Sequence, residues 1–402
     1  MRRVFDDEGM EFDRLLLLGG AYRRLTDVGE VLEALDGVVD GDGESWIARL
    51  SALGDRVRAR AEASEAGGHR ESARSAYLRA SSYYASASSH APGTEHPERF
   101  RDLWEQHRDC WDRAVPLFRP AVEKVAVPYE GTTLEGYFFH ADRAGGAADR
   151  RPTLIYNNGS DGPVTDALAA GCAAAVERGW NAFTFDGPGQ NSALHRQGLF
   201  FRHDWEAVIT PVVDWLVARD DVDPDRLALS GVSQAGYWVP RAVAFEHRIA
   251  AAVADPGVVR VSDSWRAPLP EVMTDLLDQG NKDDFDAFMQ IGMDEDPTTR
   301  ALLAWRMAPY GVSSYYDAYA AADRMHLDAE TLARIECPLL ILSPDHEQFW
   351  PGQSEVMHAA VEGSTLVAFT EAEGADWHCE PAARGQRDEV VCDWLEDVFA
   401  SR

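Results

Sequence analysis

The first 120 residues place apolar side chains at the spacing of amphipathic helices. Three helices are predicted there, over residues 45–66, over residues 71–87 and from Pro97 onward, and Ala91-Pro92-Gly93 separates the last two. The apolar positions of the first helix are Trp46, Ile47, Leu50, Leu53 and Val57. No repeat period marks this part as a solenoid. We therefore expect an N-terminal helical domain over residues 1–120.

After Pro120 the pattern changes to short apolar runs bounded by turn residues. Residues 125–127 and 134–139 predict a β-hairpin, and a polar turn is expected over residues 144–149. Strands and helices then alternate: the predicted strands are 153–156, 181–185, 227–230, 249–254, 339–342 and 364–369, and the predicted helices are 166–178, 204–219, 234–246 and 387–399. This alternation favours a mainly parallel sheet with helices on both faces. We expect it to form a second domain over residues 121–402.

One segment interrupts the alternation, at about residues 258–335. It has a helical pattern and is rich in Met, Trp and Tyr. It leaves the sheet after the strand ending near Ala254, at the edge where parallel sheets bind ligands, so we expect it to form a roof over that edge. Two interpretations remain open: a lid that gates a site, or a packed helical excursion without a gating role.

The charge balance excludes several partners. The chain has 402 residues, with 68 Asp and Glu against 38 Lys and Arg, for a formal net charge of -30. Nucleic acid and anionic membrane surfaces repel such a chain. No apolar stretch approaches the roughly 20 residues of a membrane span, and no targeting segment is visible, so a cytoplasmic location is expected. Five scattered cysteines without a CxxC pair predict reduced thiols, and neither a metal nor a cofactor is expected.

The segment LALSGVSQAGY, residues 227–237, joins a predicted strand to a predicted helix through a sharp turn. Ser233 stands in this turn, with Gly231 two residues before it and Ala235 two residues after it. A nucleophile elbow needs small residues at those two positions, because its serine lies in a strained turn. The helix start also offers a backbone N–H and a positive dipole end to an oxyanion. We predict Ser233 as a nucleophile; the alternative is an ordinary capping serine.

A serine nucleophile needs a base, and the base needs an acid that orients it. With this kind of elbow, the partners follow in the order serine, acid, histidine. His378 lies after the last predicted strand and just before the closing helix, so we predict it as the base. Asp345 and Glu347 both follow the strand ending at Leu342, and Asp376 is a third candidate acid. The residues alone leave the choice of acid open.

Two glycine-containing loops follow neighbouring strands. The loop NNGSDGP, residues 157–163, is expected to turn backbone N–H groups inward as half of an oxyanion hole; the alternative is a simple glycine-rich turn. A phosphate loop is disfavoured, because no G-K-[ST] follows. The segment FDGPGQ, residues 185–190, is interpreted as a tight turn at the carboxyl edge of the sheet, without a direct role in chemistry.

Taken together, GVSQAGY, NNGSDG, FDGPGQ, DHEQFWPGQ and GADWHCEP resemble one branch of the α/β-hydrolases, and the similarity covers nearly the whole chain. This branch includes 2,6-dihydroxypseudooxynicotine hydrolase and fungal pigment hydrolases that shorten a polyketide chain. The resemblance implies the α/β-hydrolase fold: a mostly parallel central sheet with helices on both faces, an N-terminal helical domain and a helical lid insertion.

The resemblance also assigns roles to individual residues. The acid loop of the family commonly reads G-x-x-D-x-x-x-P, which gives Glu347, four residues before Pro351, as the acid. The glutamate departs from the more frequent aspartate, so Asp345 is the reserve. By the same comparison, the oxyanion donors are the backbone N–H groups of Gln234 and Ser160.

Substrate contacts are expected from two sources. Carbon–carbon cleaving relatives use a further acidic residue beyond the strand after the elbow, and Asp255 and Asp263 lie in that region here. The aromatic content of residues 258–335 suggests an apolar pocket wall, for which we name Trp305 and Tyr316.

These features predict a serine hydrolase that uses a Ser-His-Glu triad and an acyl-enzyme. The expected substrate is a small molecule of moderate size, an ester or a ketone cleaved in retro-Claisen fashion, with an aromatic or polyketide-like part. An acyltransferase or lactone-forming enzyme with the same triad is the alternative, and a ligand-binding protein that lost catalysis is another. A homodimer and a place in natural product metabolism are further expectations.

Overall fold

The short apolar runs of the sequence build one central sheet in the computed structural model, which describes residues 3–141 and 150–401. The expected turn at residues 144–149 lies outside the described residues. The strands are β1 (Val122–Tyr129), β2 (Thr132–Phe139), β3 (Arg151–Asn157), β4 (Asn181–Phe185), β5 (Val222–Val232), β6 (Ala251–Asp255), β7 (Leu339–Pro344) and β8 (Thr365–Phe369). Their order is β1-β2-β4-β3-β5-β6-β7-β8. The pairs β1–β2 and β2–β4 are antiparallel and the other neighbours are parallel, so the predicted fold class is confirmed.

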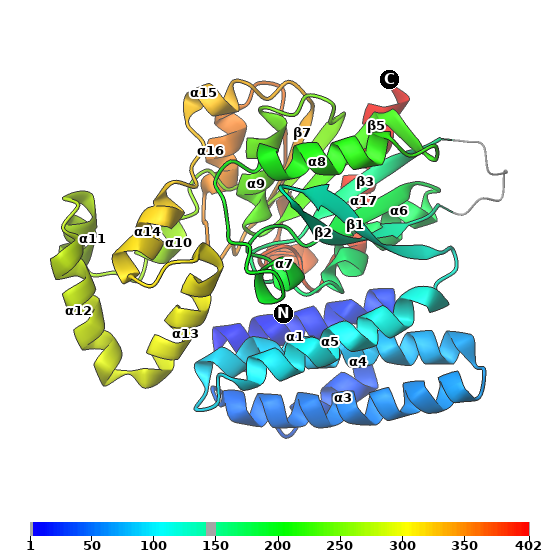
Figure 1. The fold of residues 1–402 in the computed structure, drawn as a ribbon, viewed down its shortest axis with the longest axis horizontal. Helices are drawn as coiled ribbons and strands as arrows, with labels where there is room; N and C mark the ends of the chain where they lie inside the picture. The colour runs from blue at the N-terminus through cyan, green and yellow to red at the C-terminus, as the bar shows by residue number, and fades with distance from the viewer. Residues whose placement is uncertain (1–2, 142–149, 402) are drawn as a thin grey trace.

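Two apolar cores lie on the two faces of this sheet. Along β3, Leu154 and Tyr156 belong to one core and Ile155 to the other, as the alternation of side chains along a strand requires. Helices contribute to both cores. They are α6 (Ala173–Glu177) and α17 (Arg384–Ala400) in the first core, and α8 (Glu206–Val217), α9 (Ala235–Val243) and α16 (Gln353–Ala360) in the second. Both faces of the sheet are therefore covered (Figure 1).

A layer of helices lies beneath the sheet in the view of Figure 1. It contains α1 (Glu8–Gly20), α2 (Val28–Leu35), α3 (Gly43–Ala66), α4 (Arg70–His90) and α5 (Arg99–Ala114). The α3–α4 packing is close: a Cβ added at Gly54 would lie 2.8 Å from the Tyr84 ring. Trp111 of α5 meets Tyr137 of β2 edge to face, with ring centroids 5.5 Å apart. The helical layer and the sheet thus share one continuous core.

The insertion forms a separate group of helices. They are α10 (Asp263–Arg266), α11 (Glu271–Asp278), α12 (Lys282–Glu295), α13 (Pro297–Met307), α14 (Tyr315–Asp323) and α15 (Ala329–Leu332). In Figure 1, α11 and α12 stand to the left of the sheet and α13 returns toward the N-terminal helices. A small apolar cluster of Met273, Leu277, Phe285, Met289 and Tyr319 joins α11, α12 and α14, whereas Leu332 of α15 belongs to the second core of the sheet.

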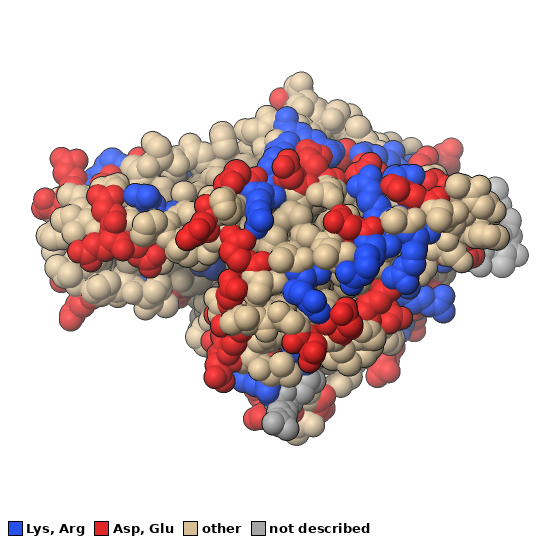
Figure 2. All heavy atoms as spheres, turned by 90° about the horizontal axis from the view of Figure 1, so that it is seen from below, with Lys and Arg blue, Asp and Glu red and all other residues tan. Residues whose placement is uncertain are grey.

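The surplus of negative charge is interspersed with arginines rather than gathered in one patch on the face shown in Figure 2. On the N-terminal helices, for example, Arg58 pairs with Asp109, and Arg113 pairs with both Glu62 and Glu65. Among the described helices, none combines the length and the apolar character needed to cross a bilayer.

Candidate active site

Four loops that carry the predicted site residues leave the carboxyl ends of parallel strands. The loop with Ser160 follows β3, Ser233 follows β5, Glu347 follows β7 and His378 follows β8. Because β3 and β5 are neighbours in the sheet, the first two loops meet at the same edge. A Cβ added at Gly159 would lie 2.8 Å from Ser233 Cβ, which places the glycine loop directly against the serine.

Ser233 lies in a strained turn between β5 and α9. Its φ of 57° is in the left-handed region that few non-glycine residues adopt. A Cβ at Gly231 would lie 2.8 Å from the Ala235 Cβ, and one at Gly236 would lie 1.8 Å from the Pro256 carbonyl oxygen. The contacts around the turn therefore require the small residues of the motif.

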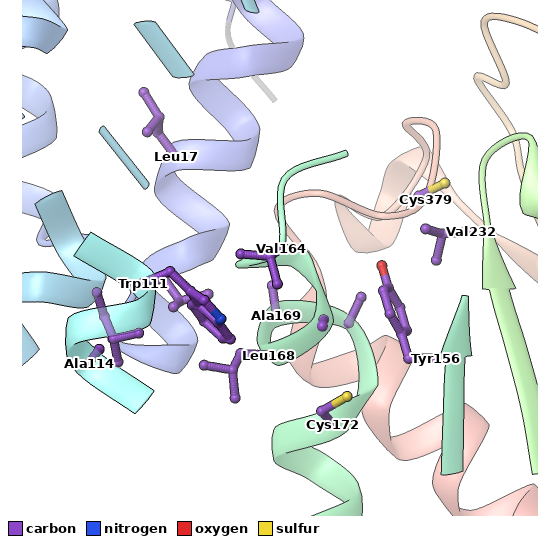
Figure 3. Packing of buried hydrophobic residues seen from close by; sticks show 14 of the residues in the cluster. Leu17, Trp111, Ala114, Tyr156, Val164, Leu168, Ala169, Cys172, Val232 and Cys379 are labelled. Atoms are coloured by element: carbon purple, nitrogen blue, oxygen red, sulfur yellow. The ribbon is translucent and has the colours of Figure 1, made fainter. Parts of the chain in front are cut away.

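The loops of the serine and the histidine converge on one carbonyl group. The Ser233 N–H donates to the Asp255 carbonyl oxygen at 2.6 Å, and the Cys379 thiol lies 3.2 Å from the same oxygen. Figure 3 shows Val232 and Cys379, the neighbours of Ser233 and His378 in the chain, close to one another near Tyr156. The structure thus brings the two predicted residues into one region of the sheet edge.

His378 is fixed by Glu347. Its Nδ1 lies 2.7 Å from Glu347 Oε2, and both side chains are almost fully buried. A carboxylate accepts only, so Nδ1 carries the proton and Nε2 is left as an acceptor. Nε2 is buried and has no hydrogen-bond partner among the described residues. It is therefore free to take a proton from a hydroxyl group that approaches it.

Two further hydrogen bonds hold the Glu347 carboxylate in place. Its Oε1 accepts hydrogen bonds from the N–H groups of Phe349, at 2.9 Å, and Trp350, at 3.1 Å. Burial alone would raise the pKa of Glu347, but the charge and hydrogen bond of His378 and these two N–H groups outweigh it and bring the pKa below its usual value. The carboxylate is ionised at neutral pH and can stabilise a positive imidazolium.

Neither of the other two candidate acids hydrogen-bonds to His378 among the described residues. Asp345 is exposed and accepts a hydrogen bond from the Glu371 N–H at 3.3 Å. Asp376 meets the acid loop through its backbone, because its carbonyl accepts from the His346 N–H at 2.7 Å. Both line a cavity of about 270 Å³ beside α1. Within the described chain, Glu347 is the candidate acid that hydrogen-bonds to His378.

Two backbone N–H groups beside Ser233 are free to bind an oxyanion. Gln234 is the N-cap residue of α9, and Ser160 follows the glycine that touches Ser233. In the described part of the chain, neither N–H donates a hydrogen bond to the protein. A helix start adds the positive end of its dipole to the first of these groups.

Aromatic rings surround the histidine. The ring centroids of Phe349, Trp350 and Phe12 lie 4.7, 5.9 and 6.1 Å from that of His378. Phe12 belongs to α1, so the N-terminal helical layer borders the site. The sequence interpretation missed Phe12, because its contact joins residues far apart in the chain and α1 was predicted only as part of a generally helical region.

The residues predicted to bind substrate lie in the insertion and contact other partners. Asp263 accepts a hydrogen bond from Gln353 at 2.8 Å, Trp305 packs edge to face on Phe100 at 5.7 Å, and Tyr316 packs on Phe285 at 6.0 Å. Among the described residues, none of the three has a hydrogen bond or ring contact with the serine, the acid or the base. Their role in binding stays a prediction.

The root of the insertion does touch the site. Met325 Sδ lies 3.7 Å from the side-chain amide of Gln234, and the Trp350 indole N–H donates to the Val261 carbonyl at 3.1 Å. Asp255, the other acid considered for substrate, is fully buried and accepts from Arg387 Nε at 2.6 Å. No group of three His, Cys, Asp or Glu side chains in the described residues is arranged to hold a metal ion.

Comparison with known proteins agrees with this architecture. No family model matches the chain. The chain is 28% identical to Hydrolase LUC6 of a Fusarium species and 26% identical to 20-hydroxy-prefusarin hydrolase FUS2 of Gibberella moniliformis, in each case over 100% of this chain and 99% of the relative. It is 33% identical to Alpha/beta hydrolase psoB of Aspergillus fumigatus over 67% of this chain and 63% of that protein. The chain belongs to the α/β-hydrolase family.

Solved structures share the fold of this α/β-hydrolase, including its helical layer. The 2,6-dihydroxy-pseudo-oxynicotine hydrolase superposes with a TM-score of 0.74 at 20% identity, over 95% of this chain and 96% of that one. AbyA5 superposes with a TM-score of 0.65 at 15% identity, over 98% and 99%. The suspected resemblance is confirmed, and the fold together with the names of the relatives supports a hydrolase activity.

Proposed function

We propose that this α/β-hydrolase is a serine hydrolase whose catalytic residues are Ser233, His378 and Glu347. One observation carries the proposal: a buried histidine is held by an ionised glutamate at 2.7 Å, and its second nitrogen has no partner within the described protein. The serine in a strained turn supplies the nucleophile at the same sheet edge. This is the arrangement that acyl transfer to a serine requires.

The reaction follows from these roles. Ser233 Oγ attacks the carbonyl carbon of the substrate while His378 Nε2 takes the hydroxyl proton, and Glu347 stabilises the imidazolium. The negative charge that develops on the substrate oxygen is bound by the N–H groups of Gln234 and Ser160. Collapse of this intermediate expels the leaving group, which receives the proton from His378. Water then repeats the sequence on the acyl-enzyme and releases the acid.

Two leaving groups fit this chemistry. An ester loses an alkoxide, which His378 protonates to an alcohol. A β-dicarbonyl loses an enolate, which receives the same proton, so that a carbon–carbon bond breaks without any oxidant. The resemblance to the branch that contains 2,6-dihydroxypseudooxynicotine hydrolase favours the second reaction, and the triad supports both.

The surroundings of His378 favour an apolar acyl group. The rings of Phe12, Phe349 and Trp350 come from α1 and from the acid loop, and they border the histidine on several sides. Aromatic surfaces of this kind bind aromatic or extended apolar groups more tightly than an acetyl group, because more apolar area leaves water. The insertion, residues 258–335, is proposed to complete the pocket as a lid.

Acyl-chain dependence tests this proposal. Turnover is measured on p-nitrophenyl acetate, hexanoate and benzoate, and on 1-phenyl-1,3-butanedione for carbon–carbon cleavage, with mass spectrometry of the trapped acyl-enzyme. The proposal expects kcat/KM to rise from acetate to the larger acyl groups and the acyl mass to lie on the Ser233 peptide. Highest turnover on acetate, or an adduct on another residue, would contradict it.

A further inference from the structure

The segment that follows β4 contains a buried glutamine whose side chain reaches the loop carrying Ser160. Gln190 is 1% exposed. Its amide nitrogen donates to the Asn158 carbonyl at 2.7 Å and to the Gly159 carbonyl at 2.6 Å, and its amide oxygen accepts from the Gly187 N–H at 2.8 Å. Both N–H donors of the side chain are therefore directed at two successive carbonyls of one loop.

Peptide geometry converts this contact into an orientation of the oxyanion donor. The Gly159 carbonyl and the Ser160 N–H belong to the same peptide group, and this peptide is not among the cis bonds of the chain. In a planar trans peptide the C=O and the N–H point in opposite directions. By holding the Gly159 oxygen on one side, Gln190 directs the Ser160 N–H to the other side.

The direction of the Ser160 N–H matters because its loop lies against the proposed nucleophile. Gly159 lies against the nucleophile, since a Cβ added there would be 2.8 Å from Ser233 Cβ and 3.3 Å from Ser233 Oγ. The Ser160 N–H belongs to the peptide group directly after Gly159. It has no acceptor in the described protein. Glycine adopts a wider range of φ and ψ angles than other residues, so a contact from outside the loop is needed to keep this peptide plane fixed.

We propose that Gln190 is a positioning residue that sets the direction of the Ser160 N–H toward the reacting carbonyl oxygen. The inference rests on the proposed function, because it takes the Ser160 N–H as an oxyanion donor. It also gives a role to the segment FDGPGQ, which the sequence pattern marks only as a tight turn.

The turn that carries Gln190 is anchored to the helical layer. The Asp186 carboxylate accepts from Arg108 Nη1 at 2.9 Å and from Ser192 Oγ at 2.6 Å. Asn191 accepts from the Trp104 indole N–H at 3.1 Å and donates to the Gly162 carbonyl at 2.9 Å. Arg108 and Trp104 both belong to α5, so this helix supports the glutamine that supports the oxyanion loop.

The loop has other supports that do not depend on Gln190. The Asn158 side chain donates to the Gly162 and Pro163 carbonyls at 2.8 and 2.9 Å, and Asn191 holds Gly162 from the other side. Loss of the glutamine amide therefore leaves the ends of the loop in place and releases the plane of the Gly159–Ser160 peptide. The expected defect is in transition-state stabilisation rather than in folding.

Two variants of the full-length protein separate the donors of Gln190 from its acceptor. Gln190→Met keeps the side-chain length and removes all three hydrogen bonds, while Gln190→Glu keeps the acceptor for the Gly187 N–H and removes both N–H donors. Asn181→Leu is the matched control: it removes a buried amide, 2% exposed, that also binds two backbone groups, at the start of β4, the strand that precedes the Gln190 segment.

The readouts are kcat and KM on p-nitrophenyl hexanoate and the inhibition constant of phenyl trifluoromethyl ketone, whose adduct with a serine carries an oxyanion. For both Gln190 variants we expect kcat to fall about 10–100-fold with KM within about threefold. The inhibition constant should rise by the same factor as kcat/KM falls. The control should lower the melting temperature without a comparable loss in kcat.

The outcomes are distinct. If Gln190→Glu restores kcat and inhibitor affinity, the glutamine serves the turn through Gly187 and the inference is wrong. It is also wrong if both Gln190 variants lose only thermal stability, as the control does. If the wild-type protein neither turns over the ester nor binds the ketone, the proposed function fails first, and the role of Gln190 fails with it.

Discussion

At the scale of single residues, Glu347 shows how a backbone conformation selects one of several chemically equivalent side chains. Its carboxylate is reached by the N–H groups of Phe349 and Trp350, which follow it in a turn, and by His378 from another loop. Asp345, two residues earlier, faces the Glu371 backbone. Two positions in the same loop thus differ in their partners: the Glu347 carboxylate orients the histidine, whereas the Asp345 carboxylate accepts from the backbone of the segment after β8.

Exchange of each carboxyl for its amide tests this distinction. Glu347→Gln should lower kcat by roughly 10²–10⁴-fold, because the charge that stabilises the imidazolium of His378 is lost and the histidine tautomer is no longer fixed. Asp345→Asn, the matched control, should change kcat less than about threefold. Steady-state kinetics at pH 7.5 decide the matter, and a reversed ranking would make Asp345 the acid.

The order of the three proposed catalytic residues could be predicted from the sequence, whereas the hydrogen bond between Glu347 and His378 could not. Ser233 follows from the small residues around it, and His378 follows from its place after the last strand. The choice between Glu347 and Asp345 depends on how the loop after β7 folds, which single-residue patterns do not encode. The ring contact of Phe12 with His378 joins residues far apart in sequence and has no local signal.

A second carboxyl near the site behaves differently. Glu380 is 0% exposed, and neither of its carboxyl oxygens has a hydrogen-bond donor within the described residues. Burial and the neighbouring Asp255 carboxylate raise the pKa of Glu380 well above its usual value, in spite of the nearby Arg387 and Arg384. Glu380 therefore keeps its proton in the folded protein at pH values where the unfolded chain has lost it.

Because the pKa of Glu380 is higher in the folded protein than in the unfolded chain, the free energy of unfolding falls as pH rises between these two values. Between the unfolded carboxyl pKa of about 4.3 and the raised folded pKa, each pH unit favours the unfolded wild-type chain by up to about 1.4 kcal/mol. Glu380→Gln lacks this contribution, so its free energy of unfolding relative to wild type should increase as pH rises from 5 to 8. Urea titrations of both proteins measure the difference. A difference that is constant or that shrinks with pH would refute the assignment.

At the scale of elements, most strands could be predicted from the sequence, because a buried strand is a short run of apolar residues between turn residues. The predicted strand 181–185 coincides with β4 (Asn181–Phe185). Helix α16 (Gln353–Ala360) was not predicted, because its eight residues are mixed in polarity and only Met357 is a large buried apolar side chain. The predicted helix at 166–178 is interrupted, because Ala170 and Gly171 have non-helical backbone angles, and α6 begins only at Ala173.

The insertion is the element whose arrangement sequence patterns describe least. Its Trp305 packs on Phe100 of α5, which joins α13 to the helical layer, while α11 and α12 extend beyond the sheet. We therefore expect Trp305→Ala to loosen the position of α13 and to change substrate selectivity more than global stability. The ratio of kcat/KM for p-nitrophenyl benzoate over acetate should fall several-fold.

An exposed residue of the same insertion provides the control. Phe288, on α12, is 54% exposed, so Phe288→Ala should leave the benzoate-to-acetate ratio within about twofold of wild type. Equal losses on both esters for Trp305→Ala, or an unchanged ratio, would show that α13 has no part in the pocket.

At the scale of the whole molecule, the helical layer and the sheet share one apolar core, so we expect them to fold as one unit. The apolar cluster that begins at Phe5 and Trp46 continues through Trp111 to Tyr137 of the sheet and Leu395 of α17. Large aromatic side chains in such an interface contribute about 1.5–3 kcal/mol each when fully buried. Separation of the two parts would expose this surface to water.

A chain that starts at Ala121 should therefore aggregate or fail to fold. The uncovered face of the sheet would present a contiguous apolar patch, including Tyr137 and Phe139, which soluble proteins rarely expose. Size-exclusion chromatography and circular dichroism measure the outcome, and co-expression of residues 1–120 as a separate chain should recover soluble protein. A truncated chain that folds as a monomer and turns over esters normally would contradict the single-unit description.

The central claim, that Ser233 is the nucleophile of a serine hydrolase, is tested most directly by covalent labelling with a fluorophosphonate probe. Wild-type protein should be labelled with 1:1 stoichiometry, and peptide mass spectrometry should place the adduct on Ser233. Ser233→Ala should abolish both labelling and turnover, with a loss of roughly 10⁴-fold or more in kcat, while its circular dichroism spectrum stays that of the wild type. Full activity of Ser233→Ala, or an adduct on another side chain, would contradict the account.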